Sequence, residues 1–264
     1  MARVAVVPVA GLARAPAVLH LAVTKKCNLS CPSCFYRGAG ENPAIVERVV
    51  RDAAEHPGVL AVAIGGGEPL LHPKLPEYVE LLSGAGKTVS VTTNGTLWRP
   101  LRADRVAISF DRLHEATWRS PGRVLGNARR FAGGCDLWVN HVLTDIPALE
   151  RTLDLFSGLA DAVVLLAPKP PELPLDRGLW EDAMRLVRER GFRLALDACV
   201  AEALGAGRCR QGVVSMSVEA DGSCALCSNV REGRVPYRGI EETWRTIPRE
   251  CPFGLRRMAP AIPS

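Results

Sequence analysis

Short, mostly apolar segments alternate with longer amphipathic segments along the first three quarters of the chain. The apolar segments predict buried strands, and they span residues 18–23, 59–64, 88–91, 105–110, 137–143 and 162–166. Apolar residues at helical spacing predict helices over residues 45–54, 75–82, 122–131, 147–156 and 179–190. This alternation is typical of parallel strands joined by crossover helices. The pattern therefore predicts an α/β fold, a partial (β/α)6 TIM-like barrel rather than the closed eight-unit barrel.

The last quarter of the chain has a different composition. After residues 192–196 the sequence becomes rich in cysteine, glycine and turn residues. We expect a barrel over residues 1–196, with its core at about 17–196, and a small cysteine-rich C-terminal extension over residues 197–264.

Composition and charge limit the classes of protein to which the chain can belong. With 47% hydrophobic and 23% charged residues, the 264-residue chain can bury an ordinary core, and it has no apolar run long enough for a membrane helix. The net charge of +5 is spread along the chain, which favours a solvated surface over a nucleic-acid partner. The apolar N-terminal segment is broken by Pro8, Gly11 and Pro16 and lacks the signature of a secretory signal. We therefore expect a cytoplasmic protein.

The chain has nine cysteines, and three of them directly follow the first predicted strand. In a reducing compartment, clustered thiols bind metal or carry out chemistry more often than they form disulfides. Thiolates at Cys27, Cys31 and Cys34 select iron–sulfur clusters or zinc, and three ligands leave an open coordination position, as catalysis requires. The alternatives are a zinc site completed by a distant ligand, or three unrelated thiols.

Glycine-rich and polar segments follow the next strands. The sequence Gly-Gly-Gly-Glu over residues 65–68 permits close backbone approach to a ligand, and its carboxylate can pair with an ammonium group. Residues 92–96 form an Asn-Gly turn, which serves either as structural support or as a ligand contact. Because the carboxyl ends of parallel strands carry the reacting groups in such barrels, these segments are expected to share one site.

Together, the CxxxCxxC spacing, the Gly-Gly-Glu-Pro element, the Thr-Asn-Gly-Thr turn and the Ser-Phe-Asp segment after the fourth strand resemble the radical S-adenosylmethionine (SAM) superfamily. The resemblance implies that Cys27, Cys31 and Cys34 hold a [4Fe–4S] cluster whose fourth iron is chelated by SAM. It also implies SAM contacts at a further set of residues: Gly66, Gly67, Glu68, Ser109 and Asn140. The family's usual aromatic residue before the third cysteine is Ser33 here, so Phe35 or Tyr36 would have to replace its adenine contact.

The cysteine-rich extension resembles the SPASM and twitch domains, which hold auxiliary iron–sulfur clusters. A turn at residues 221–222 between two short β-like segments predicts a hairpin that brings Cys209 and Cys227 together. The resemblance implies one auxiliary cluster held by Cys209, Cys227 and Cys251, with either Cys224 or Cys199 as the fourth ligand. Cys224 is favoured because it forms a CxxC pair with Cys227. A structural zinc site with the same ligands is the alternative.

The function implied by the resemblance is reductive cleavage of SAM to methionine and a 5′-deoxyadenosyl radical, which abstracts a hydrogen atom from a substrate. An auxiliary cluster favours oxidative modification, of a peptide or protein or of a small molecule. In the second case the enzyme would be a dehydrogenase of an aminocyclitol or a cofactor precursor. An electron donor such as ferredoxin or flavodoxin is implied as a partner. The alternative from another class is a non-catalytic zinc or iron–sulfur binding module.

Overall fold

The computed structural model of the chain describes residues 14–31, 34, 40–115, 120–168, 175–230 and 232–251. Its strands are β1 (Val18–Thr24), β2 (Ala61–Gly66), β3 (Thr88–Thr93), β4 (Arg105–Ser109), β5 (Asp136–Val142), β6 (Ala162–Leu166), β7 (Arg193–Leu196), β8 (Ser215–Val218), β9 (Ser223–Ala225) and β10 (Val235–Pro236). Its helices are α2 (Pro43–Glu55), the short 3₁₀ helix η1 (Pro69–Leu71), α3 (Leu75–Gly84), α4 (Arg112–Glu115), α5 (Pro121–Ala132), α6 (Ile146–Phe156), α7 (Arg177–Glu189), α8 (Ala198–Ala203) and α9 (Ile240–Thr246).

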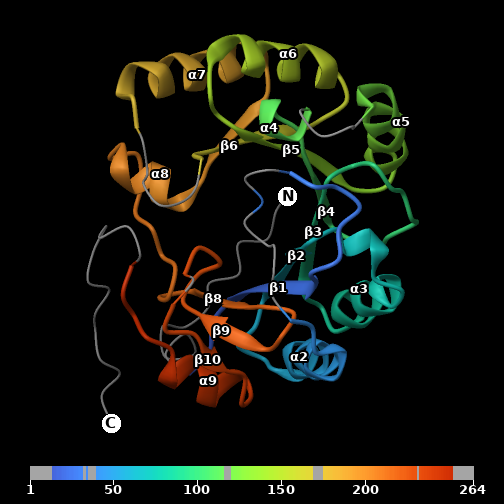
Figure 1. The fold of residues 1–264 in the computed structure, drawn as a ribbon, viewed down its shortest axis with the longest axis vertical. Coiled ribbons are helices and arrows are strands. Elements are labelled where there is room, and N and C mark those ends of the chain that lie inside the picture. The colour runs from blue at the N-terminus through green and yellow to red at the C-terminus, as the bar shows by residue number, and fades with distance from the viewer. Residues whose placement is uncertain are drawn as a thin grey trace.

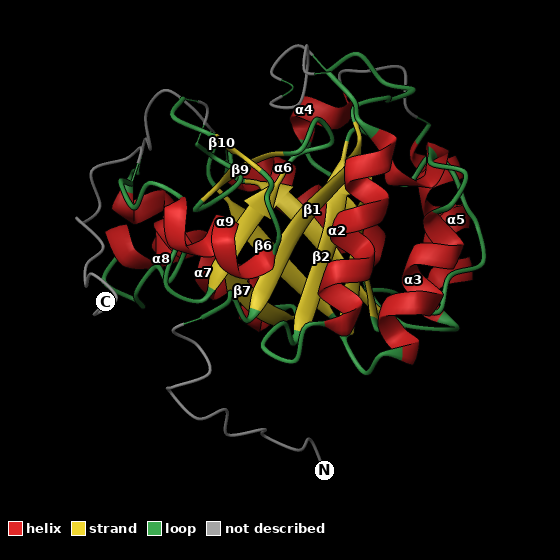
Figure 2. Cartoon of the chain, turned by 90° about the horizontal axis from the view of Figure 1, so that it is seen from below, coloured by secondary structure: helices red, strands yellow, loops and turns green. Residues whose placement is uncertain are grey.

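The strands form one sheet in the order β10-β9-β8-β1-β2-β3-β4-β5-β6-β7. Every pair from β8 through β1 to β7 is parallel, and only β9 and β10 run antiparallel to their neighbours. The helices lie on the outer face of the sheet (Figures 1 and 2). The predicted α/β partial barrel is therefore confirmed, and β7 adds a seventh parallel strand after the six that the sequence predicted.

The crossover helices begin at capping residues that can be recognised in the sequence. Asn42, Ser120 and Asp145 each accept a hydrogen bond from a backbone N–H in the first turn of α2, α5 and α6 respectively. A proline at the first or second position follows each of these caps, where its missing N–H costs no helical hydrogen bond. These starts fix where each helix leaves the preceding loop, and so they position the loops that carry polar residues.

The cysteine-rich extension joins the barrel sheet. The predicted hairpin is present as the antiparallel pair β8 and β9, and β8 also pairs in parallel with β1, with Leu19 opposite Met216. Trp244 of α9 is 2% exposed and belongs to the same buried cluster as residues of β1 and α2. The sheet and this cluster thus continue across the boundary predicted near Leu196, and a division into 1–196 and 197–264 remains a prediction.

None of the helices in the described ranges is long and apolar enough to cross a membrane.

Candidate active site

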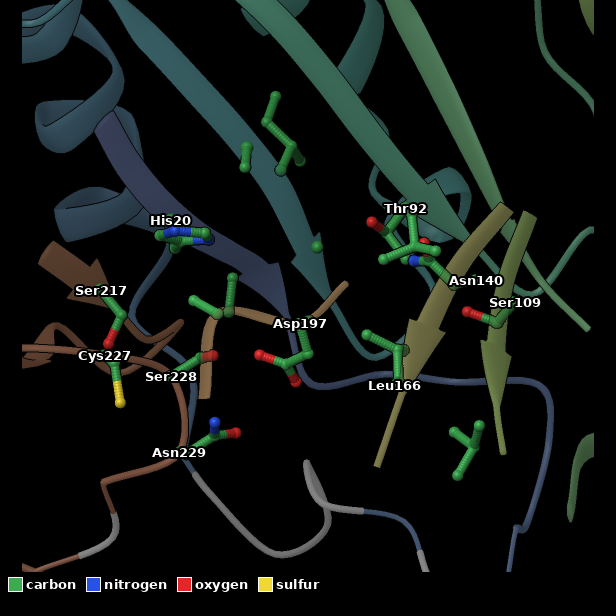
Figure 3. Close-up of a pocket in the computed structure, with 18 of the residues that line it drawn as sticks. His20, Thr92, Ser109, Asn140, Leu166, Asp197, Ser217, Cys227, Ser228 and Asn229 are labelled. Atoms are coloured by element: carbon green, nitrogen blue, oxygen red, sulfur yellow. The ribbon is translucent and has the colours of Figure 1, made fainter. Parts of the chain in front are cut away.

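A cavity of about 640 Å³ lies where the carboxyl ends of β1 to β7 meet the C-terminal extension. Figure 3 shows Ser217, Cys227 and Ser228 of the extension on one side, with Ser109 and Asn140 on the other. The cavity is within the size range of small-molecule sites. Seven of the cysteines line it: Cys27, Cys31, Cys34, Cys199, Cys209, Cys227 and Cys251. The structure therefore brings the three cysteines after β1 to the same cavity as Cys209, Cys227 and Cys251, but not Cys224, which the sequence favoured as their fourth partner.

The loop that carries Cys27 is held by its own backbone and by a distant carboxylate. Glu41 accepts hydrogen bonds from the Thr24 hydroxyl and from the backbone N–H groups of Lys25 and Lys26. The hydrogen bond from Thr24 is the main cause that lowers the pKa of Glu41. Glu41 was not identified from the sequence, because an acidic residue before a helix has no feature that reveals a contact with an earlier loop.

Two glycines clamp the end of β2 against this loop. Gly67 donates its N–H to the Thr24 carbonyl at 2.7 Å, and Glu68 donates its N–H to the Lys26 carbonyl at 2.8 Å. A Cβ atom on Gly66, where φ is 120°, would lie 2.4 Å from the Thr24 carbonyl oxygen, and one on Gly67 would lie 2.2 Å from the Lys26 carbonyl oxygen. Only glycine allows this approach at either position.

Gly65 differs from its two neighbours. It lines the cavity, and a Cβ atom built on it would meet nothing within 4 Å. The backbone at Gly65 is therefore open to whatever occupies the cavity beside the cysteines.

Glu68 is fully buried and its carboxylate holds the end of β3. One oxygen accepts from the Thr93 hydroxyl at 2.8 Å and from the Leu70 N–H at 3.0 Å, and the other accepts from the Asn94 N–H at 2.7 Å. Burial raises the pKa of Glu68, and these three hydrogen bonds oppose the rise. Glu68 does not line the cavity, whereas Gly66 and Gly67 do.

The turn after β3 contacts the cysteine loop directly. The Asn94 amide donates to Asn28 Oδ1 at 3.0 Å, and the Asn28 amide donates to the Thr96 hydroxyl at 2.8 Å. The Asn94 amide also lies 3.8 Å from the Cys27 sulfur. Gly95 permits the turn, since its φ is 74°. The turn therefore supports the cysteine loop, and Asn94 also places a polar group near Cys27, a candidate cluster ligand.

Ser109 and Asn140 are neighbours in the sheet, because they are paired residues on β4 and β5. Both line the cavity (Figure 3). His114, also in the lining, has its Nδ1 2.7 Å from the buried carboxylate of Asp111. Burial opposes ionisation of Asp111, but the hydrogen bonds from His114 hold its pKa below the ordinary value. His114 was not singled out in the sequence, since its contact with the cavity depends on how α4 follows β4.

Cys209, Cys227 and Cys251 of the extension lie near one another at the cavity. Burial is the main cause that raises the pKa of Cys227, and the neighbouring thiols of Cys251 and Cys209 raise it further. The sulfur of Cys209 accepts a hydrogen bond from the backbone N–H of Gln211, and that of Cys227 accepts one from Asn229. The Leu29 N–H donates to the Cys27 sulfur in the same way. Backbone donors to sulfur are a common feature of iron–sulfur ligands.

The two other cysteines of the extension lie in different surroundings. Cys224 is fully buried, belongs to the apolar core and does not line the cavity. Cys199, at the start of α8, is 6% exposed and lines the cavity. Cys135 is half-buried away from the cavity, and its thiol donates to the Phe131 carbonyl at 3.3 Å.

A buried ion-pair network joins the cysteine loop to the extension. Glu219, which directly follows β8, pairs with the Lys25 ammonium through one oxygen and with the Arg234 guanidinium at 3.2 Å through the other. The side chains of Lys25, Glu219 and Arg234 are 6%, 4% and 11% exposed. The three residues are far apart in the sequence, so no local pattern could have revealed this network.

The donor groups around the cavity are mainly thiols. Within the described ranges, no three Cys, His, Asp or Glu side chains stand together as a site for one metal ion. The thiols instead surround a shared cavity, and thiolates are the ligands of iron–sulfur clusters. The open backbone of Gly65 leaves room for a small molecule beside Cys27, Cys31 and Cys34. Ser33, Phe35 and Tyr36, with their expected relation to adenine, lie outside the described residues.

Comparison with curated proteins finds relatives in the archaea. A probable GTP 3′,8-cyclase of Methanothermobacter marburgensis is 38% identical over 114 residues, which cover 38% of this chain and 37% of that protein. The same description applies to a protein of Methanosarcina acetivorans, which is 34% identical over 161 residues that cover 54% of this chain and 47% of that protein. The chain thus matches less than half of the length of these relatives.

Comparison with solved structures supports the fold. Streptococcus suis SuiB bound to S-adenosylmethionine superposes with a TM-score of 0.69 at 18% identity, over 84% of this chain and 63% of SuiB. SuiB bound to its precursor peptide SuiA gives a TM-score of 0.70 at 17% identity, over 88% of this chain and 65% of SuiB.

A family model agrees with the site. The Radical SAM superfamily model matches residues 21–132, a range that holds Cys27, Cys31, Cys34, the β2 glycines and the turn after β3. Residues 21–132 are therefore similar to the radical SAM domain.

Proposed function

We propose that this chain is a radical SAM enzyme that oxidatively modifies a substrate, either a peptide or a small molecule. The observation that carries the proposal is the shared cavity, which has Cys27, Cys31 and Cys34 on the barrel side and Cys209, Cys227 and Cys251 on the extension side. A radical SAM domain implies a [4Fe–4S] cluster and SAM, and this pair supplies an oxidising carbon radical from reductive cleavage of a sulfonium carbon–sulfur bond.

Different residues of the chain would bind different parts of the cluster and of SAM. Cys27, Cys31 and Cys34 would hold the cluster through thiolates. The backbone of the β2 glycines, Gly65 to Gly67, would face the SAM amino group, while Ser109 and Asn140 would donate and accept hydrogen bonds at its ribose. Glu68 would act by holding the glycines and the β3 turn in place, because its carboxylate already accepts three hydrogen bonds from β3 and η1.

The charge of the cavity bears on the substrate. Of the described residues that line it, none is lysine or arginine, and three are acidic: Asp197, Glu202 and Glu219. The charge of Glu219 is already matched by Lys25 and Arg234. Nucleotide phosphates are bound by cationic side chains or by backbone N–H groups at helix N-termini, and the described part of the lining offers no lysine or arginine for the phosphates of GTP.

Two groups of three thiols, one from the barrel and one from the extension, share the cavity. This arrangement favours a net oxidation of the substrate. Cys209, Cys227 and Cys251 would hold an auxiliary iron–sulfur cluster, which would supply a one-electron acceptor beside the substrate. Asp197, which projects into the cavity between its two sides (Figure 3), is placed to bind a donor group of the substrate.

The test is formation of 5′-deoxyadenosine by anaerobically reconstituted protein supplied with SAM and dithionite. Wild type should form it, and Cys27→Ala should fall to background. Cys135→Ala is the matched control, because Cys135 lies away from the cavity, and it should retain wild-type product formation. Equal product from Cys27→Ala and wild type, or none from wild type, would contradict the proposal.

A further inference from the structure

We propose that Cys199, in place of Cys224, is the fourth thiolate ligand of an auxiliary [4Fe–4S] cluster whose other ligands are Cys209, Cys227 and Cys251. This inference rests on the proposed function, since it takes the extension to hold an iron–sulfur cluster. The fold favours Cys199 as the fourth ligand, whereas the sequence pattern favours Cys224 because it forms a CxxC pair with Cys227.

The first argument is placement. Cys199 lines the same cavity as the three gathered cysteines, and Cys224 does not. Cys224 lies on β9, in the core cluster that also contains Met216 and Trp244. Cys227 borders the same core cluster, but it follows the end of β9 and lines the cavity, whereas Cys224 is 0% exposed within the strand.

The second argument is that the chain ties α8 to the Cys209 loop. Glu202 of α8 accepts a hydrogen bond from the Cys209 N–H at 2.6 Å. Cys199 and Glu202 are three residues apart on this helix, so they share one side of it. Both residues line the cavity. The bond to Glu202 therefore places the start of α8 next to the segment that carries Cys209.

The third argument is that Cys251 is brought to the same place. Arg249 donates one guanidinium N–H to the Gly212 carbonyl and another to the Trp244 carbonyl at 2.6 Å. Its guanidinium also lies 4.1 Å from the centre of the Trp244 ring. Gly212 in turn packs against Leu226, the residue before Cys227, where a Cβ atom on the glycine would lie 3.0 Å from that of the leucine. These contacts hold the segments of Cys209, Cys227 and Cys251 together independently of any metal.

The state of the two thiols agrees with this assignment. The Cys224 thiol donates to the Gly222 carbonyl at 3.5 Å, and burial raises the pKa of Cys224 to about 12. The Cys199 thiol donates to the Asp197 carboxylate at 3.2 Å, at the edge of the cavity.

The test uses the full chain with Cys27, Cys31 and Cys34 replaced by alanine, so that only the extension can hold iron. After anaerobic reconstitution this parent should contain about four iron and four sulfide per chain. Adding Cys199→Ser should lower iron to about three or less and give the EPR signal of a [3Fe–4S] cluster on oxidation, because the fourth iron has lost its thiolate. Adding Cys224→Ser is the matched control and should leave iron, sulfide and the spectrum as in the parent.

Loss of iron in the Cys224 variant with retention in the Cys199 variant would overturn the proposal, as would binding of zinc alone by the parent. If either variant fails to fold, alkylation of the loaded parent by iodoacetamide answers the same question. Cys199 should become labelled together with Cys209 only after iron is removed with a chelator, whereas Cys224 should stay unlabelled throughout. Labelling of Cys199 in the loaded protein would contradict the assignment. Because the test uses no SAM cleavage, its failure is distinct from failure of the proposed activity.

Discussion

The contrast between Gly67 and Gly65 gives the sharpest mutational prediction. In Gly67→Ala the new methyl group would lie 2.2 Å from the Lys26 carbonyl oxygen and 2.7 Å from that of Lys25, so the cysteine loop must move away from β2. In Gly65→Ala the new methyl group meets nothing within 4 Å and projects into the cavity. Two adjacent substitutions of the same kind should therefore separate fold stability from ligand binding.

The loss of stability expected for Gly67→Ala follows from the contacts that the movement of the cysteine loop disrupts. Overpacking of this kind costs about 1 to 3 kcal/mol. Separation of the loop also weakens the hydrogen bonds from the Gly67 and Glu68 N–H groups, each worth about 1 kcal/mol. The sum is about 4 kcal/mol of unfolding free energy. At about 2 to 4 °C per kcal/mol, the Tm should fall by about 8 to 16 °C.

The assay is thermal unfolding of both variants and wild type, each prepared in the same way, together with SAM binding by equilibrium dialysis of the iron-loaded proteins. Gly65→Ala should change the free energy of unfolding by less than about 1 kcal/mol and weaken SAM binding about tenfold or more. A Gly67→Ala protein that melts with wild type would refute the reasoning. So would a Gly65→Ala protein that binds SAM as tightly as wild type.

Two further predictions concern charged residues around the same loop. Glu219→Gln leaves Lys25 and Arg234 buried without their carboxylate, so the urea midpoint should fall by the equivalent of about 3 to 5 kcal/mol. Glu189→Gln, which removes one side of an exposed ion pair, is the control and should cost less than about 1 kcal/mol. Equal effects of the two substitutions would argue against the buried network. The pKa of Glu41 is lowered by folding, so its contribution to stability is complete above its unfolded value of about 4.3 and is lost as the pH falls through the lowered value. The difference in unfolding free energy between wild type and Glu41→Gln, both without iron, should therefore close as the pH falls below about 4, and a gap independent of pH would contradict this account.

Much of the fold could be predicted from the sequence because its signals are local. Proline following Ser120 or Asp145 marks a helix start, and mostly apolar segments such as residues 162–166 mark strands buried on both faces. What could not be predicted is the pairing of β8 with β1, since parallel pairing between the two ends of the chain leaves no local pattern.

The site shows the same division between local and distant information. The spacing of Cys27, Cys31 and Cys34 and the glycines at β2 were legible because each lies in one short segment. The roles of Glu41 and Glu219 depend on contacts between distant segments, which only the folded chain brings together. The choice between Cys199 and Cys224 likewise depends on which face of β9 points to the core, and a CxxC spacing does not carry that information.

The most direct test of the central claim, that Cys27, Cys31 and Cys34 hold a cluster that binds SAM in this cavity, is the EPR spectrum of the dithionite-reduced, iron-loaded protein with and without SAM. The account predicts that SAM changes the spectrum of the wild-type protein, because SAM binds the iron that has no cysteine ligand, and that the change is absent in Cys27→Ala. A wild-type spectrum that SAM does not alter, or a change that persists in Cys27→Ala, would contradict it.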